Sequence, residues 1–74
     1  MAQECRIGTW LFRIDPSNSA RLQRRNMGST SYSHLWDAPN GERILDLMTR
    51  GSDLIIETDR RTYIRNNSGG IRPA

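Results

Sequence analysis

Residues 39–65 read PNGERILDLMTRGSDLIIETDRRTYIR and hold most of the regularly spaced apolar side chains in this 74-residue chain. Within 44–48 the apolar residues recur at the spacing of an amphipathic helix. Asn40 is suited to begin such a helix and Gly51 to end it. We therefore predict a short helix over 41–50 with one buried apolar face.

The second half of the same stretch predicts an antiparallel hairpin with strands over 53–58 and 61–66. Both strands are rich in β-branched and aromatic residues, and polar residues lie between them. A turn at this polar segment gives two cross-strand pairs, Ile56 with Tyr63 and Ile55 with Ile64.

A third strand is expected over 5–14, CRIGTWLFRI, where β-branched and aromatic residues are dense. Pro16 ends it, because proline removes a backbone donor and restricts the residue before it. Apolar residues on both faces indicate a covered strand. The expected architecture is a small α+β domain, with a three-stranded antiparallel sheet and the 41–50 helix packed on it.

A second short helix is expected over 18–27, as an alternative to a mobile loop. Arg21, Arg24 and Arg25 would then share one face, because their spacing is i, i+3, i+4. No acidic residue lies between Asp15 and Asp37 to pair with them. The three arginines are either solvated, or they contact phosphates or an acidic protein surface.

Residues 66–74, NNSGGIRPA, predict a flexible tail, because asparagine, serine and paired glycines disfavour regular structure. The tail carries Ile71 and Arg72, which could order on a partner. The compact domain is accordingly expected to span 1–65.

Charge and composition limit the functional classes. The net charge is +3, and all eleven basic residues are arginine. Arginine alone is explained either by the codon bias of a GC-rich genome or by a use for planar, bidentate contacts. No secretory signal and no long apolar run is present, so we expect a cytoplasmic protein without a membrane partner.

No residue pattern indicates catalysis, a metal site or a cofactor. Cys5 is the single cysteine and His34 the single histidine, so a disulfide within the chain and a multi-histidine site are excluded. The glycines form neither a phosphate-binding loop nor a dinucleotide fingerprint. We expect a protein that is not an enzyme.

Three functions are compatible with these features. The first is a regulator that binds, and inhibits, a larger host complex such as RNA polymerase; small size and lack of lysine suggest a phage or plasmid origin. The alternatives are direct RNA or DNA binding and self-association as an assembly protein, and the oligomeric state stays open. The expected contact residues are Arg21, Arg24, Arg25, Arg60, Arg61, Arg65, Arg72, Ile71 and Trp36.

Overall fold

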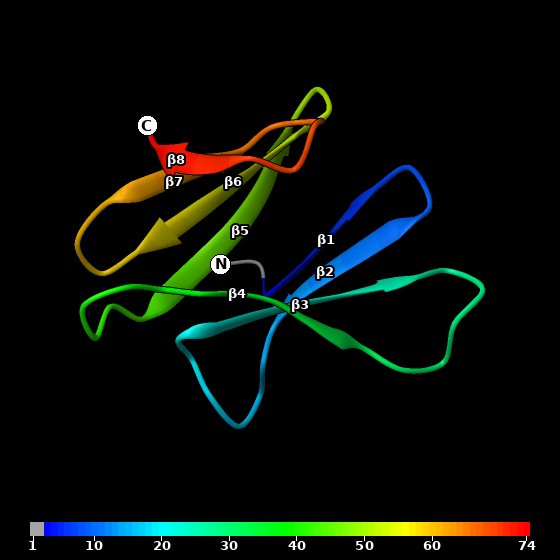
Figure 1. The fold of residues 1–74 in the computed structure, drawn as a ribbon, viewed down its shortest axis with the longest axis horizontal. Coiled ribbons are helices and arrows are strands. Elements are labelled where there is room, and N and C mark those ends of the chain that lie inside the picture. The colour runs from blue at the N-terminus through cyan, green and yellow to red at the C-terminus, as the bar shows by residue number, and fades with distance from the viewer. Residues whose placement is uncertain (1–2) are drawn as a thin grey trace.

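The computed structural model describes residues 3–74, and every regular element in that range is a β-strand. Sheet A contains β1 (Glu4–Ile7), β2 (Trp10–Ile14), β3 (Arg21–Asn26) and β4 (Ser33–Asp37). Sheet B contains β5 (Ile44–Arg50), β6 (Asp53–Thr58), β7 (Thr62–Arg65) and β8 (Ile71–Pro73). Both sheets are antiparallel, and sequential strands are neighbours (Figure 1). The expected α+β fold with a three-stranded sheet and a helix is therefore wrong.

The segment expected to be the 41–50 helix forms β5 instead. A β-bulge shifts the register against β6 between Ile44 and Asp46. Because the bulge adds one residue, Ile44 and Leu47 both face the core at a spacing of three. An amphipathic helix produces the same spacing. Gly51, with φ 61°, lies in the β5–β6 turn rather than at a helix end.

The segment expected to be the 18–27 helix contains β3. Leu22 is fully buried and pairs with Ile14 of β2, and this burial favours a strand over the local helix propensity. Alternation along β3 places Leu22 and Arg24 toward sheet B, and Arg21 and Arg25 on the outer face. The three arginines therefore do not share one face.

The single strand expected over 5–14 is a hairpin. Gly8 has φ 60°, a conformation that glycine adopts without steric cost, and it turns the chain between β1 and β2. Cys5 then pairs with Phe12 and Ile7 with Trp10.

The C-terminal segment is part of sheet B. Ile71 pairs with Arg65 and Pro73 with Tyr63, so the expected flexible tail is corrected to an edge strand. The hairpin predicted before it is confirmed in its pairing, Ile55 with Ile64 and Ile56 with Tyr63.

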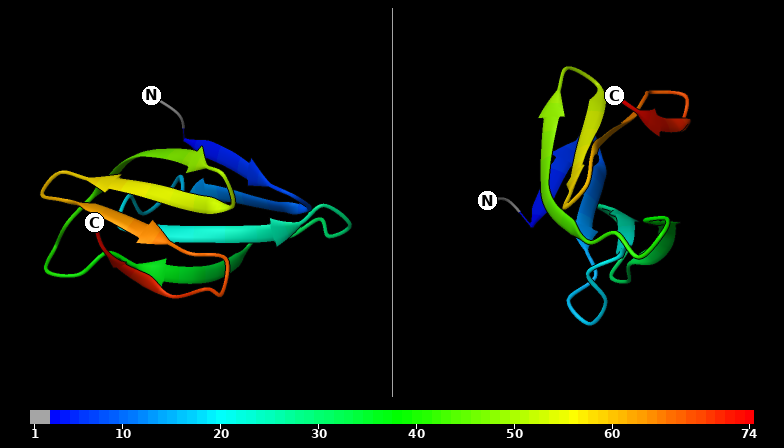
Figure 2. Two further views of the ribbon diagram at one scale, coloured as in Figure 1. Left: turned by 90° about the horizontal axis from the view of Figure 1, so that it is seen from above. Right: turned by 90° about the vertical axis from the view of Figure 1, so that its left-hand side faces the viewer.

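The two sheets pack face to face around one core, and β1 of sheet A lies beside β5 of sheet B (Figure 2). The buried apolar side chains are Phe12, Ile14, Leu22, Ala38, Ile44, Leu47, Leu54, Ile56 and Tyr63. In Figure 1 the sheets diverge toward the β1–β2, β5–β6 and β7–β8 connections. Residues 3–74 contain no helix long and apolar enough to cross a membrane.

Candidate functional site

Sheet A holds arginines stacked on aromatic rings. On its outer face the guanidinium of Arg13 lies 3.9 Å from the ring centroid of Tyr32, and that of Arg25 lies 5.4 Å from the same centroid. On its inner face the guanidinium of Arg24 lies 4.2 Å from the ring centroid of Trp10. Such cation–π contacts hold a guanidinium over the ring without neutralising its charge.

Two hydrogen bonds further orient the outer pair. Arg13 Nε donates to Gln23 Oε1 at 2.8 Å, and Arg25 Nη1 donates to the Ser29 carbonyl at 2.9 Å. Neither arginine takes part in an ion pair with another residue of 3–74. The outer face thus presents two positioned guanidinium groups close to one tyrosine.

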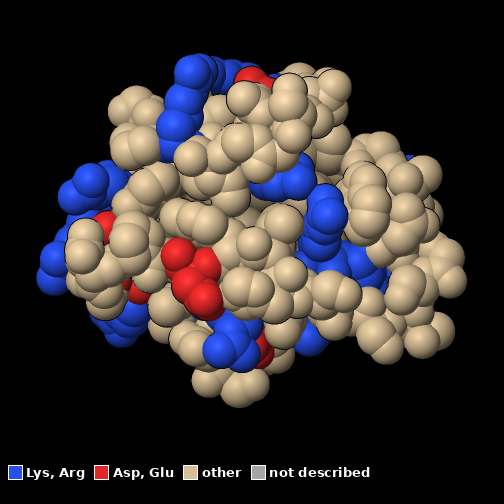
Figure 3. Space-filling view, in the orientation of Figure 1, with Lys and Arg blue, Asp and Glu red and all other residues tan. Residues whose placement is uncertain are grey.

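A cavity of about 140 Å³ opens between the two sheets at their diverging end. Its lining consists of Ile7, Trp10, Phe12, Arg24, Ser52, Arg65 and Asn67. Arg24 enters from sheet A and Arg65 from sheet B, where the Arg65 guanidinium lies 5.5 Å from the Phe12 ring centroid. Figure 3 shows basic side chains in the hollow between the sheets, apart from the acidic side chains on this face.

The electrostatics of this cleft are unbalanced. Burial, and then the positive charge of Arg24, lower the pKa of Arg65 from its ordinary value. The buried Nε of Arg65 has no hydrogen-bond partner, and no carboxylate lines the cavity. Folding therefore brings together two like charges that no described side chain of this cleft neutralises.

The stacked pair Trp10 and Arg24 also lines a second hollow, of about 290 Å³. The other lining residues are Arg25, Asn26, Ser29, Ser31, Ser33 and His34. Trp10 and Arg24 thus form a wall shared by an arginine cleft and a hollow rich in hydroxyl and amide groups.

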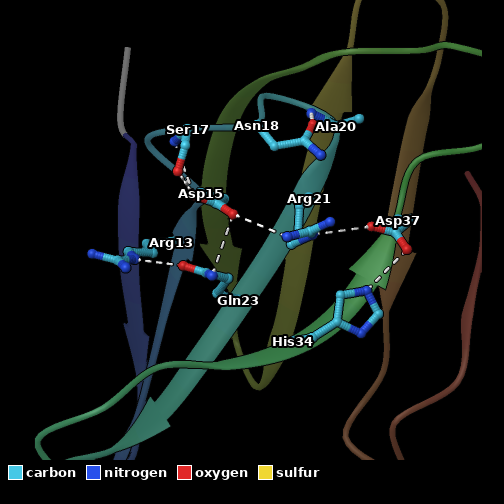
Figure 4. A network of polar contacts seen from close by, with 9 residues as sticks. All are labelled: Arg13, Asp15, Ser17, Asn18, Ala20, Arg21, Gln23, His34 and Asp37. Carbon is cyan, nitrogen blue, oxygen red and sulfur yellow. Dashed lines mark hydrogen bonds and ion pairs between the residues drawn. The ribbon is translucent and has the colours of Figure 1, made fainter.

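Arg21 lies in a polar network with two carboxylates, and this network reaches Arg13 through Asp15 and Gln23 (Figure 4). Arg21 Nη1 lies 3.5 Å from Asp15 Oδ2, and its Nε lies 3.6 Å from Asp37 Oδ1. His34 Nε2 lies 3.0 Å from the other oxygen of Asp37. This network joins the β2–β3 connection to the end of β4, and the charge of Arg21 is matched within it.

A fully buried carboxylate, Glu42, lies at the opposite end of sheet B. The Tyr63 hydroxyl donates to it at 3.0 Å, and the Thr58 hydroxyl donates at 2.7 Å. Arg61 Nε lies 3.7 Å away. Burial, and then the Glu42 carboxylate, raise the pKa of Tyr63. Because Glu42 has no exposed surface, it links strands through buried hydrogen bonds and is not placed to contact a substrate.

The structure distributes the residues expected to contact a partner over several places. It brings Arg24 and Arg65 together in the cleft and leaves Arg25 on the outer face of sheet A. Arg60 and Arg72 are exposed on sheet B or its turns, whereas Arg61 pairs with Glu42.

Two of the expected contact residues are packing residues. Trp36 stacks edge-on against Tyr63 with ring centroids 5.0 Å apart, and Ile71 packs against the core. Sequence reasoning missed Asn67 and could name Trp10 and Tyr32 only as rings able to stack on bases, because only cross-strand pairing and sheet packing place them beside arginines. It also missed Glu42, for which the sequence holds no periodic signal.

Comparison with protein families, with curated proteins and with solved structures finds no match for this chain. No group of three or more metal-ligating side chains occurs in the part of the chain that the structure describes.

Proposed function

We propose that this protein binds nucleic acid through sheet A. The carrying observation is the set of arginine–aromatic stacks, Arg13 and Arg25 on Tyr32 and Arg24 on Trp10. A guanidinium held over an aromatic ring keeps its planar set of N–H donors, which suits bidentate contact with phosphate oxygens. The aromatic rings beside the arginines offer surfaces on which unpaired bases stack.

Single strands fit this surface better than a duplex. Sequence reading in the major groove uses a helix or a protruding two-stranded ribbon. Sheet A instead offers a four-stranded surface with aromatic and arginine side chains, an arrangement that suits splayed-out bases and a tracked backbone.

The regulatory role expected from the sequence relied partly on a tethered peptide at 71–72. Because β8 pairs with β7, residues 71–72 are not a tethered peptide, and this argument for a regulatory role loses its support. A regulator that acts through bound nucleic acid remains compatible with the proposal.

The test measures fluorescence anisotropy of labelled single-stranded oligonucleotides with 5′-hydroxyl ends, over a series of salt concentrations. The Arg13→Ala/Arg25→Ala variant should bind at least about tenfold more weakly, because two phosphate contacts are lost. Its slope of log affinity against log salt should fall by about 1.4, at about 0.7 per contact for single strands.

The matched control is Arg50→Ala/Arg72→Ala, which removes the same charge from exposed positions on sheet B. It should keep most of the affinity. Equal losses in both variants, or no binding at low salt, would overturn the proposal and leave an acidic protein surface as the ligand of these arginines.

A further inference from the structure

We propose that the cleft between the sheets binds a phosphate monoester, the terminal phosphate of a nucleotide. Arg24 and Arg65 converge on this cleft from opposite sheets, and Ser52 and Asn67 stand at its rim. The chemistry is the same for a free mononucleotide and for the phosphorylated end of a strand. Only the second source rests on the proposed nucleic-acid binding.

The need for an anion follows from the unmatched charges. Two guanidinium groups share a partly buried cavity of about 140 Å³ with no carboxylate in its lining. Arg65 Nε is shielded from solvent and has no acceptor. An oxygen ligand between the two arginines would accept from their terminal N–H groups and offset the repulsion. The rings of Trp10 and Phe12 already hold both guanidiniums in position.

The shape of the cavity favours a terminal group over an internal phosphodiester. Its rim is made by exposed turn residues, Ser52 and Asn67, whereas Phe12 at its inner side is buried in the core. A strand that entered could not leave through that side. A monoester also carries a charge of about −1.5 to −2 at neutral pH, which two guanidiniums match.

The neighbouring hollow indicates a nucleotide rather than phosphate alone. It shares the Trp10–Arg24 wall with the cleft, and its volume is about 290 Å³. Asn26, Ser31 and Ser33 supply hydrogen-bonding groups around it. A phosphate held at Arg24 and Arg65 would place the attached sugar and base beside Trp10, within reach of this hollow.

Isothermal titration calorimetry with inorganic phosphate, adenosine 5′-monophosphate and adenosine tests the site. Phosphate and the monophosphate should bind the native chain, with adenosine at least about tenfold weaker than the monophosphate. Arg65→Gln and Arg24→Gln should each weaken both phosphate-bearing probes at least about tenfold. Arg72→Gln, at an exposed position on β8, should leave both affinities unchanged.

Thermal unfolding separates a lost site from a lost fold. Without added anion, Arg65→Gln should melt at or above the native temperature, because one of two repelling, partly buried charges is gone. Phosphate should raise the melting temperature of the native chain and not that of the variant. The proposal is overturned if neither phosphate-bearing probe binds the native chain, or if Arg65→Gln binds them with native affinity.

Two oligonucleotides of the same sequence, one with and one without a terminal phosphate, distinguish the two sources of the monoester, a strand end and a free mononucleotide. At least about tenfold tighter binding of the phosphorylated strand identifies strand ends, and equal binding beside a tight monophosphate identifies the free nucleotide. If the monoester probes fail while 5′-hydroxyl strands still bind through Arg13 and Arg25, the cleft proposal falls and the proposed function stands. If the monoesters bind while no strand binds, the cleft proposal stands and the proposed function falls.

Discussion

Glu42 illustrates how one residue can hold three segments together. A buried carboxylate is costly unless donors surround it, and here two hydroxyls donate to it while the Arg61 guanidinium lies nearby. The two hydroxyls come from the end of β6 and from β7, and the guanidinium comes from the turn between them, while Glu42 itself precedes β5. Loss of the carboxylate would leave the hydroxyls of Thr58 and Tyr63 in the core without their shared acceptor.

Glu42→Ala should lower the free energy of unfolding by about 2–4 kcal/mol, because buried polar groups lose their partner and a cavity forms. Urea unfolding followed by circular dichroism measures this change. The control Glu57→Ala, at an exposed position on β6, should stay within about 0.5 kcal/mol of the native chain. Equal losses for the two variants would contradict the fastening role of Glu42.

At the scale of elements, the β2–β3 connection is built around the side chain of Asp15. Its Oδ1 accepts the Ser17 backbone N–H at 2.9 Å and the Ser17 hydroxyl at 3.0 Å. The backbone bond, more than the hydroxyl or the arginines Arg21 and Arg13, lowers the pKa of Asp15 below its ordinary 3.8.

The pH dependence of stability follows from the sign of this shift. A carboxyl with a lowered pKa in the folded state stabilises the protein above pH 3.8, and that stability is lost as pH falls through the lower folded value. The melting temperature of Asp15→Asn should therefore lie below the native one near neutral pH, and the gap should close below about pH 4. Thermal scans at several pH values measure the gap.

Ser17→Ala keeps the backbone donor to Asp15. The melting-temperature difference that Asp15→Asn causes should therefore be only partly smaller in the Ser17→Ala background than in the native chain. A gap that is constant from acid to neutral pH would show that Asp15 acts without its charge.

The elements also show how far the sequence could predict the fold. The 53–58 and 61–66 hairpin was predictable because its apolar residues sit on both sides of a polar turn, and Ile56 does pair with Tyr63. The strand β5 was not, because its bulge gives Ile44 and Leu47 a helical spacing. For β3 the local helix propensity was outweighed by burial of Leu22, which only the packed sheets provide.

The same reasoning applies to the candidate site. Arg24 and Arg65 could be named as contact residues from charge alone. Their juxtaposition could not, because they belong to different sheets and are more than forty positions apart in the chain. Likewise, Trp10 stacks on Arg24 only because β2 and β3 are paired in one register. Long-range packing, and not the local pattern, makes the site.

At the scale of the whole molecule, the two sheets share one core. Leu54 of sheet B is fully buried in the same cluster as Phe12 and Leu22 of sheet A. Both tryptophans, Trp10 and Trp36, lie on sheet A, and Trp36 also contacts Tyr63, so their fluorescence reports sheet A and its packing on sheet B. Because the core is shared, a substitution that destabilises sheet B should also destabilise sheet A.

Leu54→Ala should cost about 3 kcal/mol, through lost apolar burial and a residual cavity. The urea midpoint should fall equally by tryptophan fluorescence and by far-ultraviolet circular dichroism, as in a two-state transition. Met48→Ala, at a position 43% exposed on the outer face of β5, should cost less than about 1 kcal/mol. Separate midpoints for the two signals would show that the sheets unfold independently.

Two arginines at one end of the molecule have carboxylate partners, and the two in the cleft at the other end do not. This difference affects how an anion in solution approaches the protein. At the β6–β7 end, Arg61 is matched by Glu42 and Arg43 by Asp59. At the diverging end, the guanidiniums of Arg24 and Arg65 are unmatched. The open end therefore carries positive charge that no described side chain of the cleft offsets. This charge attracts an approaching anion before contact, and added salt shortens the range of the attraction.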